Sequence, residues 1–155
     1  MMASIMNMKA MTVAYLPMTG SYDQMPAAFD RLYAWIEEHD LKATGAPIAA
    51  FFNIPSEPDG SDARWELLVA LSGDPADIEP DETGVGVKRV EGMKVVSAIH
   101  IGPYDSVLPT YQALWAWMED HSYDLDGPPM ERYLSGPEVP AERVRTEVLM
   151  PIRRV

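Results

Sequence analysis

The second half of the chain repeats the first half at a constant spacing. Gly20-Ser-Tyr22-Asp23 aligns with Gly102-Pro-Tyr104-Asp105, which lies 82 positions later since 104 − 22 = 82. The same spacing aligns Leu32, Ala34, Trp35, Glu37 and His39 with Leu114, Ala116, Trp117, Glu119 and His121. Because no insertion or deletion interrupts this stretch, we interpret the chain as an internal duplication. Two similar halves predict a pseudo-twofold molecule with a central cleft between them, where function is expected.

The length of the chain suits one domain over residues 1–155, with repeat one at about 11–72, a junction at about 73–92 and repeat two at about 93–155. The 47% of hydrophobic residues supply a core, and no apolar run reaches the ~18 residues of a membrane helix. The Met-rich start, up to Met11, lacks the order of a secretory signal and is interpreted as a frayed lead-in. We therefore expect a cytoplasmic protein with no membrane association.

The chain is acidic, with 24 Asp and Glu against 12 Lys and Arg and a net charge of −12. This charge repels phosphate backbones, so no direct nucleic-acid binding is expected. It favours either a solvated acidic surface or attraction of cationic ligands. The absence of cysteine excludes disulfides and thiolate sites, and the three histidines lack the close spacing of metal ligands. We expect no metal and no cofactor.

Hydrophobic periodicity predicts the same order of elements in each repeat. Repeat one is predicted to contain strands at 11–16, 48–53 and 65–72, and repeat two strands at 95–101, 130–134 and 144–151. A long helix follows the first strand of each repeat, near Asp23–His39 and Asp105–His121, and residues 84–90 favour an additional strand. The fold class is α+β, with duplicated β-α-β-β repeats, antiparallel sheets and two long helices.

Each predicted helix carries an apolar stripe that we assign to the core. The stripes are Met25, Phe29, Leu32, Tyr33 and Ile36, and Leu108, Tyr111, Leu114, Trp115 and Met118. Trp35 and Trp117 lie about 60° to the side of Leu32 and Leu114 at 100° per residue. These two tryptophans are therefore expected to flank the cleft.

The last hairpin concentrates the charged chemistry. Its loop contains Ser135–Pro140, and a hairpin centre near residue 139 places Glu131 opposite Glu147 and Tyr133 opposite Arg145 on one face. Facing carboxylates suggest a raised pKa or a site that attracts cations. The alternative is a slipped register with two solvated glutamates.

The two repeats differ at this point. Glu66 precedes an apolar run as Glu147 does, whereas Ala49 stands where Glu131 stands. A pocket between the repeats is expected to be acidic on the side of repeat two. Aromatic walls that favour flat cations are expected from Trp35, Trp117, Trp65, Phe51 and Tyr133.

Four motifs of the chain resemble the GyrI-like small-molecule-binding domains. They are His100-x-Gly-Pro-Tyr104, the Tyr111 to Trp117 segment, Gly127-Pro-Pro-x-Glu131-x-Tyr133 and Thr146-Glu147-x-x-x-Pro151. The resemblance covers about Thr12 to Ile152 and is looser in repeat one. It implies a duplicated β-α-β-β fold.

The resemblance also implies a function. Domains of this family bind lipophilic, often cationic, compounds, alone or as effector domains of multidrug-responsive transcription activators. A glutamate neutralises the ligand in such domains, and the matching residue here is Glu147. The full set of expected ligand-binding residues is Glu147, Glu131, Tyr133, Trp117, Tyr104, Trp35, Trp65, Phe51 and Glu66. No DNA-reading role is expected, because no helix-turn-helix is found before residue 12.

Two alternatives to a binding protein stay open at this point. Some stand-alone members look like hydrolases that open strained cyclopropane rings, and Glu131 and Glu147 match their carboxylates. In that case one carboxylic acid protonates the carbonyl oxygen while the other carboxylate orients a water. The family also includes a gyrase-inhibiting protein, so the second alternative is a protein-interaction module with a protein partner.

Overall fold

The computed structural model describes residues 2–155, which divide into two compact units. The first unit is formed by residues 10–91, and the second by the chain from Gly92 to the C-terminus together with the segment that ends at Lys9. Each unit combines one long helix with an antiparallel sheet, so the predicted α+β fold is confirmed. None of the helices within the described residues has the length and apolar character of a membrane span.

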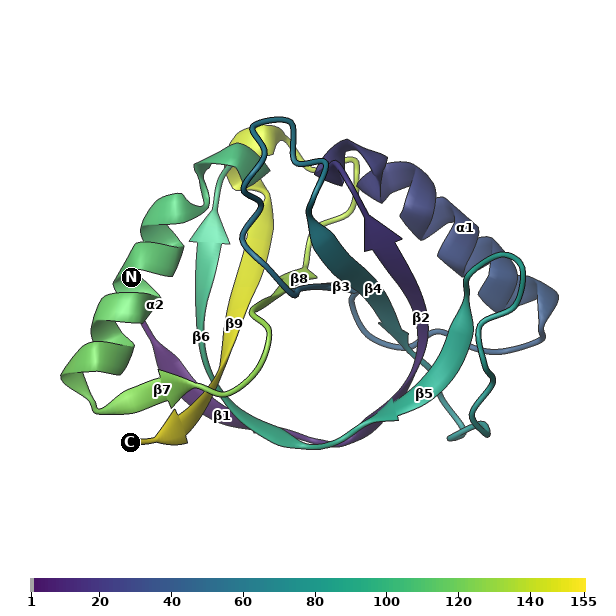
Figure 1. Cartoon of the computed structure of the whole chain (residues 1–155), viewed down its shortest axis with the longest axis horizontal. Coiled ribbons are helices and arrows are strands. Elements are labelled where there is room, and N and C mark those ends of the chain that lie inside the picture. The colour runs from purple at the N-terminus through teal and green to yellow at the C-terminus, as the bar shows by residue number, and fades with distance from the viewer. Residues whose placement is uncertain (1) are drawn as a thin grey trace. The chain divides into compact units, whose positions relative to one another are not determined.

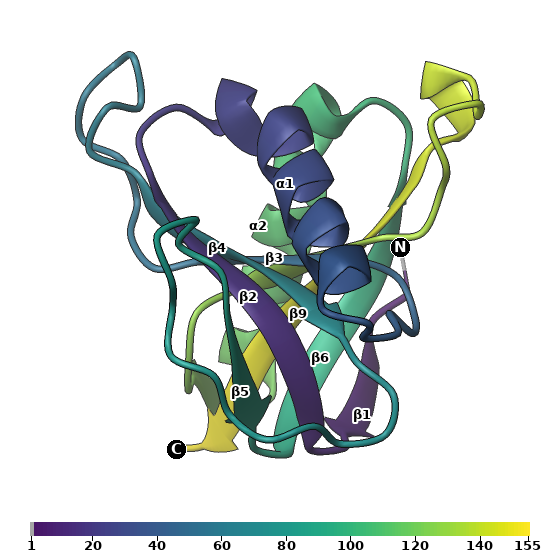
Figure 2. The same ribbon diagram turned by 90° about the vertical axis from the view of Figure 1, so that its right-hand side faces the viewer.

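The first unit begins with its central strand. Its elements are β2 (Met11–Thr19), the 3-10 turn η1 (Tyr22–Gln24), α1 (Met25–Glu38), β3 (Ile48–Phe51), β4 (Arg64–Ala70) and β5 (Gly86–Val90). The strands lie in the order β3-β4-β2-β5, each antiparallel to its neighbour. Helix α1 packs across β2 and β4 (Figure 2). The strand predicted at 84–90 is therefore confirmed as β5.

The second unit repeats this plan. Its elements are β6 (Met93–Ile101), η2 (Tyr104–Ser106), α2 (Leu108–Asp120), β7 (Tyr123–Leu125), β8 (Met130–Tyr133), η3 (Ala141–Arg143) and β9 (Arg145–Arg154). Strand β9 pairs with β6, β7 and β8, all antiparallel. Helix α2 packs against β6, β7 and β9 (Figure 1). Leu114 and Met118 of α2 form one apolar core with Val96, Ala98, Val148 and Met150.

The N-terminal segment is a strand, which corrects the prediction of a frayed lead-in. Residues Ser4–Met8 form β1, which pairs antiparallel with β6, with Met6 opposite Val95. The segment has no helical or alternating pattern of its own, and its partner lies far along the chain. The local hydrophobic pattern of the sequence therefore could not predict this pairing.

The duplication extends to the bounds of the elements. A shift of 82 positions moves β2 onto β6, η1 onto η2 and β3 onto β8. Before the last strand the spacing falls by one, because 14 positions separate the paired residues Phe51 and Trp65, whereas 13 separate Tyr133 and Thr146. In the last strands Glu66 therefore corresponds to Glu147, and the residue before it, Trp65, corresponds to Thr146.

The helical stripes are only partly core. Leu32, Ile36, Leu114 and Met118 are buried, as predicted. The prediction is wrong for Tyr33, Leu108 and Trp115, which are 37%, 61% and 46% exposed. Leu108 and Trp115 lie two turns apart at the edge of the apolar stripe. They are exposed because the sheet covers a narrower arc of the helix than the stripe spans.

Candidate functional site

The register of the last hairpin differs from the prediction by one residue. Arg132 is opposite Glu147, Glu131 is opposite Val148 and Tyr133 is opposite Thr146. The predicted pairs of Glu131 with Glu147 and of Tyr133 with Arg145 are therefore wrong. Because a shift of one residue moves a side chain to the other face of a strand, Glu131 and Glu147 lie on opposite faces of the sheet.

Glu131 lies on the face that carries α2. Its partner across the sheet, Val148, belongs to the core formed with this helix. The Tyr111 hydroxyl, from the second turn of α2, donates to Glu131 Oε2 at 2.6 Å. The Tyr133 hydroxyl, from the end of β8, donates to Oε1 at 3.0 Å. Two neutral donors stabilise a carboxylate without cancelling its charge.

Tyr104 completes an aromatic group around this carboxylate. Its ring meets that of Tyr133 edge to face, with centroids 5.6 Å apart and planes at 83°. Burial, followed by the charge of Glu131 and the hydrogen bond to it, raises the pKa of Tyr133 above the usual phenol value. Tyr133 therefore stays a protonated donor at neutral pH. We name Tyr104, Tyr111, Glu131 and Tyr133 the tyrosine–glutamate cluster.

The turn before α2 is fixed by His100, the first residue of the His100-x-Gly-Pro-Tyr104 motif. Its Nε2 lies 2.9 Å from the Pro103 carbonyl oxygen and 3.1 Å from Ser106 Oγ. The Ser106 hydroxyl also donates to the Pro103 carbonyl. These bonds hold the turn that carries Tyr104, so the histidine has a positioning role beside the cluster.

Glu147 has a different environment. Its side chain is buried, with 8% of the residue exposed, and its Oε1 lies 2.9 Å from Nη1 of Arg132. The corresponding Glu66 of the first unit is also buried and pairs with Lys88 of β5. Both carboxylates thus have a cation from their own unit as partner. That Glu147 and Glu66 bind a ligand stays a prediction.

Two of the predicted aromatic residues of the first unit, Phe51 and Trp65, contact Tyr22. Tyr22 meets Phe51 and Trp65 edge to face, at centroid distances of 5.5 and 5.7 Å. Trp65 is 1% exposed, and its indole N–H donates to the Gly20 carbonyl at 2.9 Å. Of these three rings only Trp65 is fully buried, whereas Tyr22 is 38% exposed.

Trp35 and Trp117 stack on the histidine four residues later. Trp35 is buried, lies 3.8 Å from the His39 ring and donates its indole N–H to Asp81 at 2.8 Å. Hydrogen bonds from Thr83 and Trp35 lower the pKa of Asp81. Trp117 stacks between His121 and Tyr123. Both tryptophans therefore have a structural role at the helix ends, and their contact with a ligand stays a prediction.

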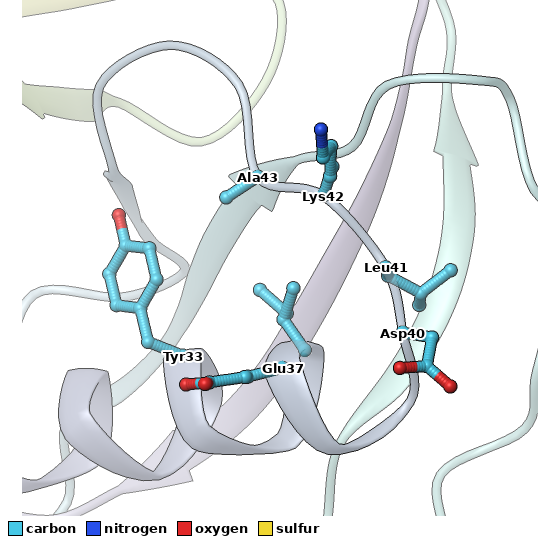
Figure 3. Close-up of a pocket in the computed structure, with 7 residues that line it drawn as sticks. Tyr33, Glu37, Asp40, Leu41, Lys42 and Ala43 are labelled. Atoms are coloured by element: carbon cyan, nitrogen blue, oxygen red, sulfur yellow. The ribbon is translucent and has the colours of Figure 1, made fainter.

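A surface hollow lies at the other end of α1. Its lining residues are Tyr33, Ile36, Glu37, Asp40, Leu41, Lys42 and Ala43 (Figure 3). Tyr33 and Glu37 project from the helix, and Lys42 and Ala43 lie on the segment that follows it. The hollow is wide open and contains none of the predicted site residues. Since a ligand site combines concave shape with convergent polar groups, we place no site there.

Some site residues were missed by the sequence analysis. Tyr111 of α2 was assigned to the core. A buried phenol usually needs a hydrogen-bond partner for its hydroxyl, and this requirement was the available signal. Arg132 carried no signal, because its role depends on the strand register. Thr146 belongs to one of the four motifs, but its place opposite Tyr133 also depends on the register. Within residues 2–155 no group of three or more His, Asp or Glu side chains is arranged to hold a metal ion.

Comparison with known proteins identifies the family. The model of the GyrI-like small-molecule binding domain matches residues 1–153. The chain belongs to the GyrI-like family. It is therefore a small-molecule binding domain, as its four motifs indicated. No curated protein matches the sequence.

Solved GyrI-like structures share the fold. The C-terminal domain of EcmrR has a TM-score of 0.83 at 20% identity, over 99% of this chain and 98% of that domain. In the EcmrR–DNA complex the TM-score is 0.85 at 19% identity, and the chain spans 58% of the length of EcmrR and 99% of its own. A hydrolase from Listeria innocua has a TM-score of 0.75 at 16% identity, over 97% and 91% of the two chains. SAV2435, solved with tetraphenylphosphonium, has a TM-score of 0.63 at 17% identity, over 99% of this chain and 94% of that chain.

Proposed function

We propose that the second unit binds lipophilic aromatic cations beside Glu131. The observation that carries this proposal is the tyrosine–glutamate cluster, in which both carboxylate oxygens accept hydrogen bonds from phenols. A carboxylate fixed in this way among aromatic rings attracts positive charge by both its own charge and the ring faces. The net charge of −12 favours the approach of cations.

The contrast with the other buried glutamates supports the choice of Glu131. Glu147 and Glu66 are neutralised by Arg132 and Lys88. Among the ion pairs of residues 2–155, none includes Glu131. A ligand cation beside Glu131 would therefore meet a carboxylate whose charge no basic side chain cancels. A cation at Glu147 would first have to displace Arg132.

The structural relative SAV2435 supports the ligand class, since it was solved with tetraphenylphosphonium, a lipophilic cation. This chain is expected to bind such cations with micromolar affinity and to sequester them. From the sequence, the ligand was expected in a cleft between the repeats, with Glu147 as the neutralising residue. The proposal assigns that role to Glu131 instead.

Titration calorimetry with tetraphenylphosphonium tests the proposal. Glu131→Gln should weaken binding by about 10–100-fold, the scale of a lost charge-assisted interaction. Neutral triphenylphosphine oxide should bind the variant and the wild type alike. Glu138→Gln, in the exposed loop of the same hairpin, is the matched control and should leave both ligands unaffected. If Glu147→Gln weakens the cation and Glu131→Gln does not, the assignment to Glu131 is wrong.

A second candidate is hydrolysis of a strained cyclopropane, for which the hydrolase from Listeria innocua offers a structural parallel. The mechanism with paired carboxylates needs Glu131 and Glu147 on one patch, whereas the β8–β9 register places them on opposite faces. A version that uses Glu131 alone remains open to test. Its carboxylate would orient a water whose hydroxyl adds to a ring carbon as the carbon–carbon bond breaks, and the carbonyl oxygen of the substrate takes the proton.

Product analysis separates this candidate from simple binding. A hydrolase should convert a cyclopropane-bearing dienone to its water adduct over many turnovers, and Glu131→Gln should slow the conversion by ~10²-fold or more. A binding protein would return the compound intact. Turnover that Glu131→Gln leaves unchanged would contradict a catalytic role for Glu131.

A further inference from the structure

Thr146 has a buried hydroxyl without a hydrogen-bond partner. The residue is 1% exposed, and among the side chains of residues 2–155 its Oγ1 is the one buried nitrogen or oxygen atom that lacks such a partner. An unpaired buried hydroxyl is costly, and nearly all buried polar groups are hydrogen-bonded. This hydroxyl therefore needs an explanation.

The strand register places Thr146 within the tyrosine–glutamate cluster. It stands between His100 of β6 and Tyr133 of β8, directly opposite each of them. It shares the α2 face with Glu131, which is its diagonal neighbour at roughly 7–8 Å between backbones. The nearby His100 Nε2 already contacts Pro103 and Ser106.

The corresponding residue of the first unit differs in size and in bonding. Trp65 stands there, its indole N–H is bonded to Gly20, and its ring is the second edge partner of Tyr22. In the second unit Tyr104 makes the matching contact with Tyr133, and threonine offers no second ring. The second unit thus has a small side chain with a free hydroxyl where the first has a large satisfied one.

We infer that Thr146 is a second recognition point of the ligand site and accepts or donates a hydrogen bond to a nitrogen or oxygen atom of the ligand. The inference rests on the proposed function and names the ligand class more closely. The ligand is a flat aromatic cation that carries a polar atom within roughly 7–8 Å of its charge. Its ring takes the place that the Trp65 indole takes in the first unit.

Two probe ligands separate the contribution of the hydrogen bond to affinity from the contribution of the charge. Rhodamine 6G is a flat cation with an ester carbonyl and N–H groups, whereas tetraphenylphosphonium has no nitrogen or oxygen atom. In the full chain, Thr146→Val should weaken rhodamine 6G by about 3–10-fold, the range of a neutral hydrogen bond, and leave tetraphenylphosphonium within twofold. Thr146→Ser should restore rhodamine 6G binding.

Two further variants complete the test. Thr146→Trp should weaken both probes by more than tenfold, because an indole would close the site as it does in the first unit. Thr12→Val, at a buried threonine of the first unit that is bonded to Asp74, is the control and should leave both affinities unchanged. Thr146→Val should also melt no lower than the wild type, since it removes an unsatisfied hydroxyl. The valine variant therefore keeps the test informative if the tryptophan variant does not fold.

The possible results are distinct. Equal weakening of both probes by Thr146→Val would show that Thr146 only shapes the site, and unchanged binding of both would show that its hydroxyl makes no contact with the ligand. Either result overturns the inference. If the wild type binds neither probe, the proposed function fails as well. If Glu131→Gln weakens both probes and Thr146→Val neither, the proposed function stands and the role of Thr146 is refuted.

Discussion

The two units have matched elements but different interiors beneath the start of the helix. In the first unit Tyr22, Phe51 and Trp65 pack ring against ring. In the second unit the corresponding residues are Tyr104, Tyr133 and Thr146, and Glu131 stands where the first unit has Ala49. One scaffold thus holds three aromatic rings in contact in one copy and a polar cluster in the other. After a duplication, a few residues of one repeat can therefore carry the function of the whole domain.

The other face of each sheet is alike in chemistry but not in sequence. Glu66 is paired by Lys88 of β5, which also lies 4.3 Å from the centre of the Tyr15 ring. Glu147 is paired by Arg132 of β8. Because the two cations come from non-equivalent strands, each unit neutralises its buried carboxylate in its own way. This points to a structural role for both ion pairs.

The largest expected effect tests the packing of Trp65 in the first unit. Trp65→Ala should lower the free energy of unfolding by about 3–5 kcal/mol, the usual cost of removing a buried aromatic side chain. Thr146→Ala should change it by less than about 1 kcal/mol, since it removes an unpaired hydroxyl. Urea denaturation measures both. Equal losses would show that the two positions are packed alike.

The ion pairs should matter for stability and little for binding. Glu147→Gln and Glu66→Gln should each destabilise the chain by about 1–3 kcal/mol, because a partly buried cation loses its partner. Tetraphenylphosphonium affinity of the folded variants should stay within twofold. Denaturant curves and calorimetry on the same samples provide the data. A variant that keeps its stability but loses its affinity for tetraphenylphosphonium would show that the substituted glutamate binds the cation.

Because of the Tyr133 phenol, we expect the free energy of unfolding to fall in alkali. Its pKa is raised in the folded state, so its contribution is fully present below pH 10, the ordinary phenol value, and falls as pH rises above it. Between pH 8 and 11 the wild type should lose about 1 kcal/mol more than Tyr133→Phe. Tyr104→Phe, at an exposed phenol, serves as the control and should follow the wild type. Identical curves for wild type and Tyr133→Phe would argue against a buried phenol beside a charge.

The smallest expected effect concerns the loop between β3 and β4. Hydrogen bonds from Ser56 and Glu57 lower the pKa of Asp62 to about 2. The order that this carboxylate gives the loop should persist above its unfolded value of 3.8 and be lost as pH falls to about 2. Amide exchange at Ser56 and Glu57 should accelerate there and in Asp62→Asn at neutral pH. Exchange that is independent of pH and of the substitution, after correction for intrinsic rates, would contradict this.

The sequence predicted the elements better than the site. The 82-residue spacing and the apolar periodicity predicted both helices and most strands, because those patterns are local. Strand β1 was missed because its partner, β6, is remote in the sequence. The predicted hairpin register was wrong because it rested on an assumed loop centre at residue 139, whereas the observed pairs are centred between residues 139 and 140. That shift of one position in the pairing decides whether Glu131 shares a face with Glu147.

The candidate site was therefore predicted in its residue types but not in its geometry. Tyr104, Glu131 and Tyr133 were named from the sequence, and the structure brings them together with Tyr111. Glu147 was named for the same site and lies on the other face. Its Arg132 partner follows from the register alone, so the sequence did not indicate that Glu147 is paired with a basic side chain and Glu131 is not.

A crystal structure of the chain with tetraphenylphosphonium is the strongest test of the proposed site at Glu131. We expect the phosphorus atom near the Glu131 carboxylate in the second unit, with phenyl rings against Tyr104 and Tyr133, and with the Arg132–Glu147 and Lys88–Glu66 pairs intact. A cation bound at Glu147 with Arg132 displaced, or bound among Tyr22, Phe51 and Trp65 of the first unit, would contradict it.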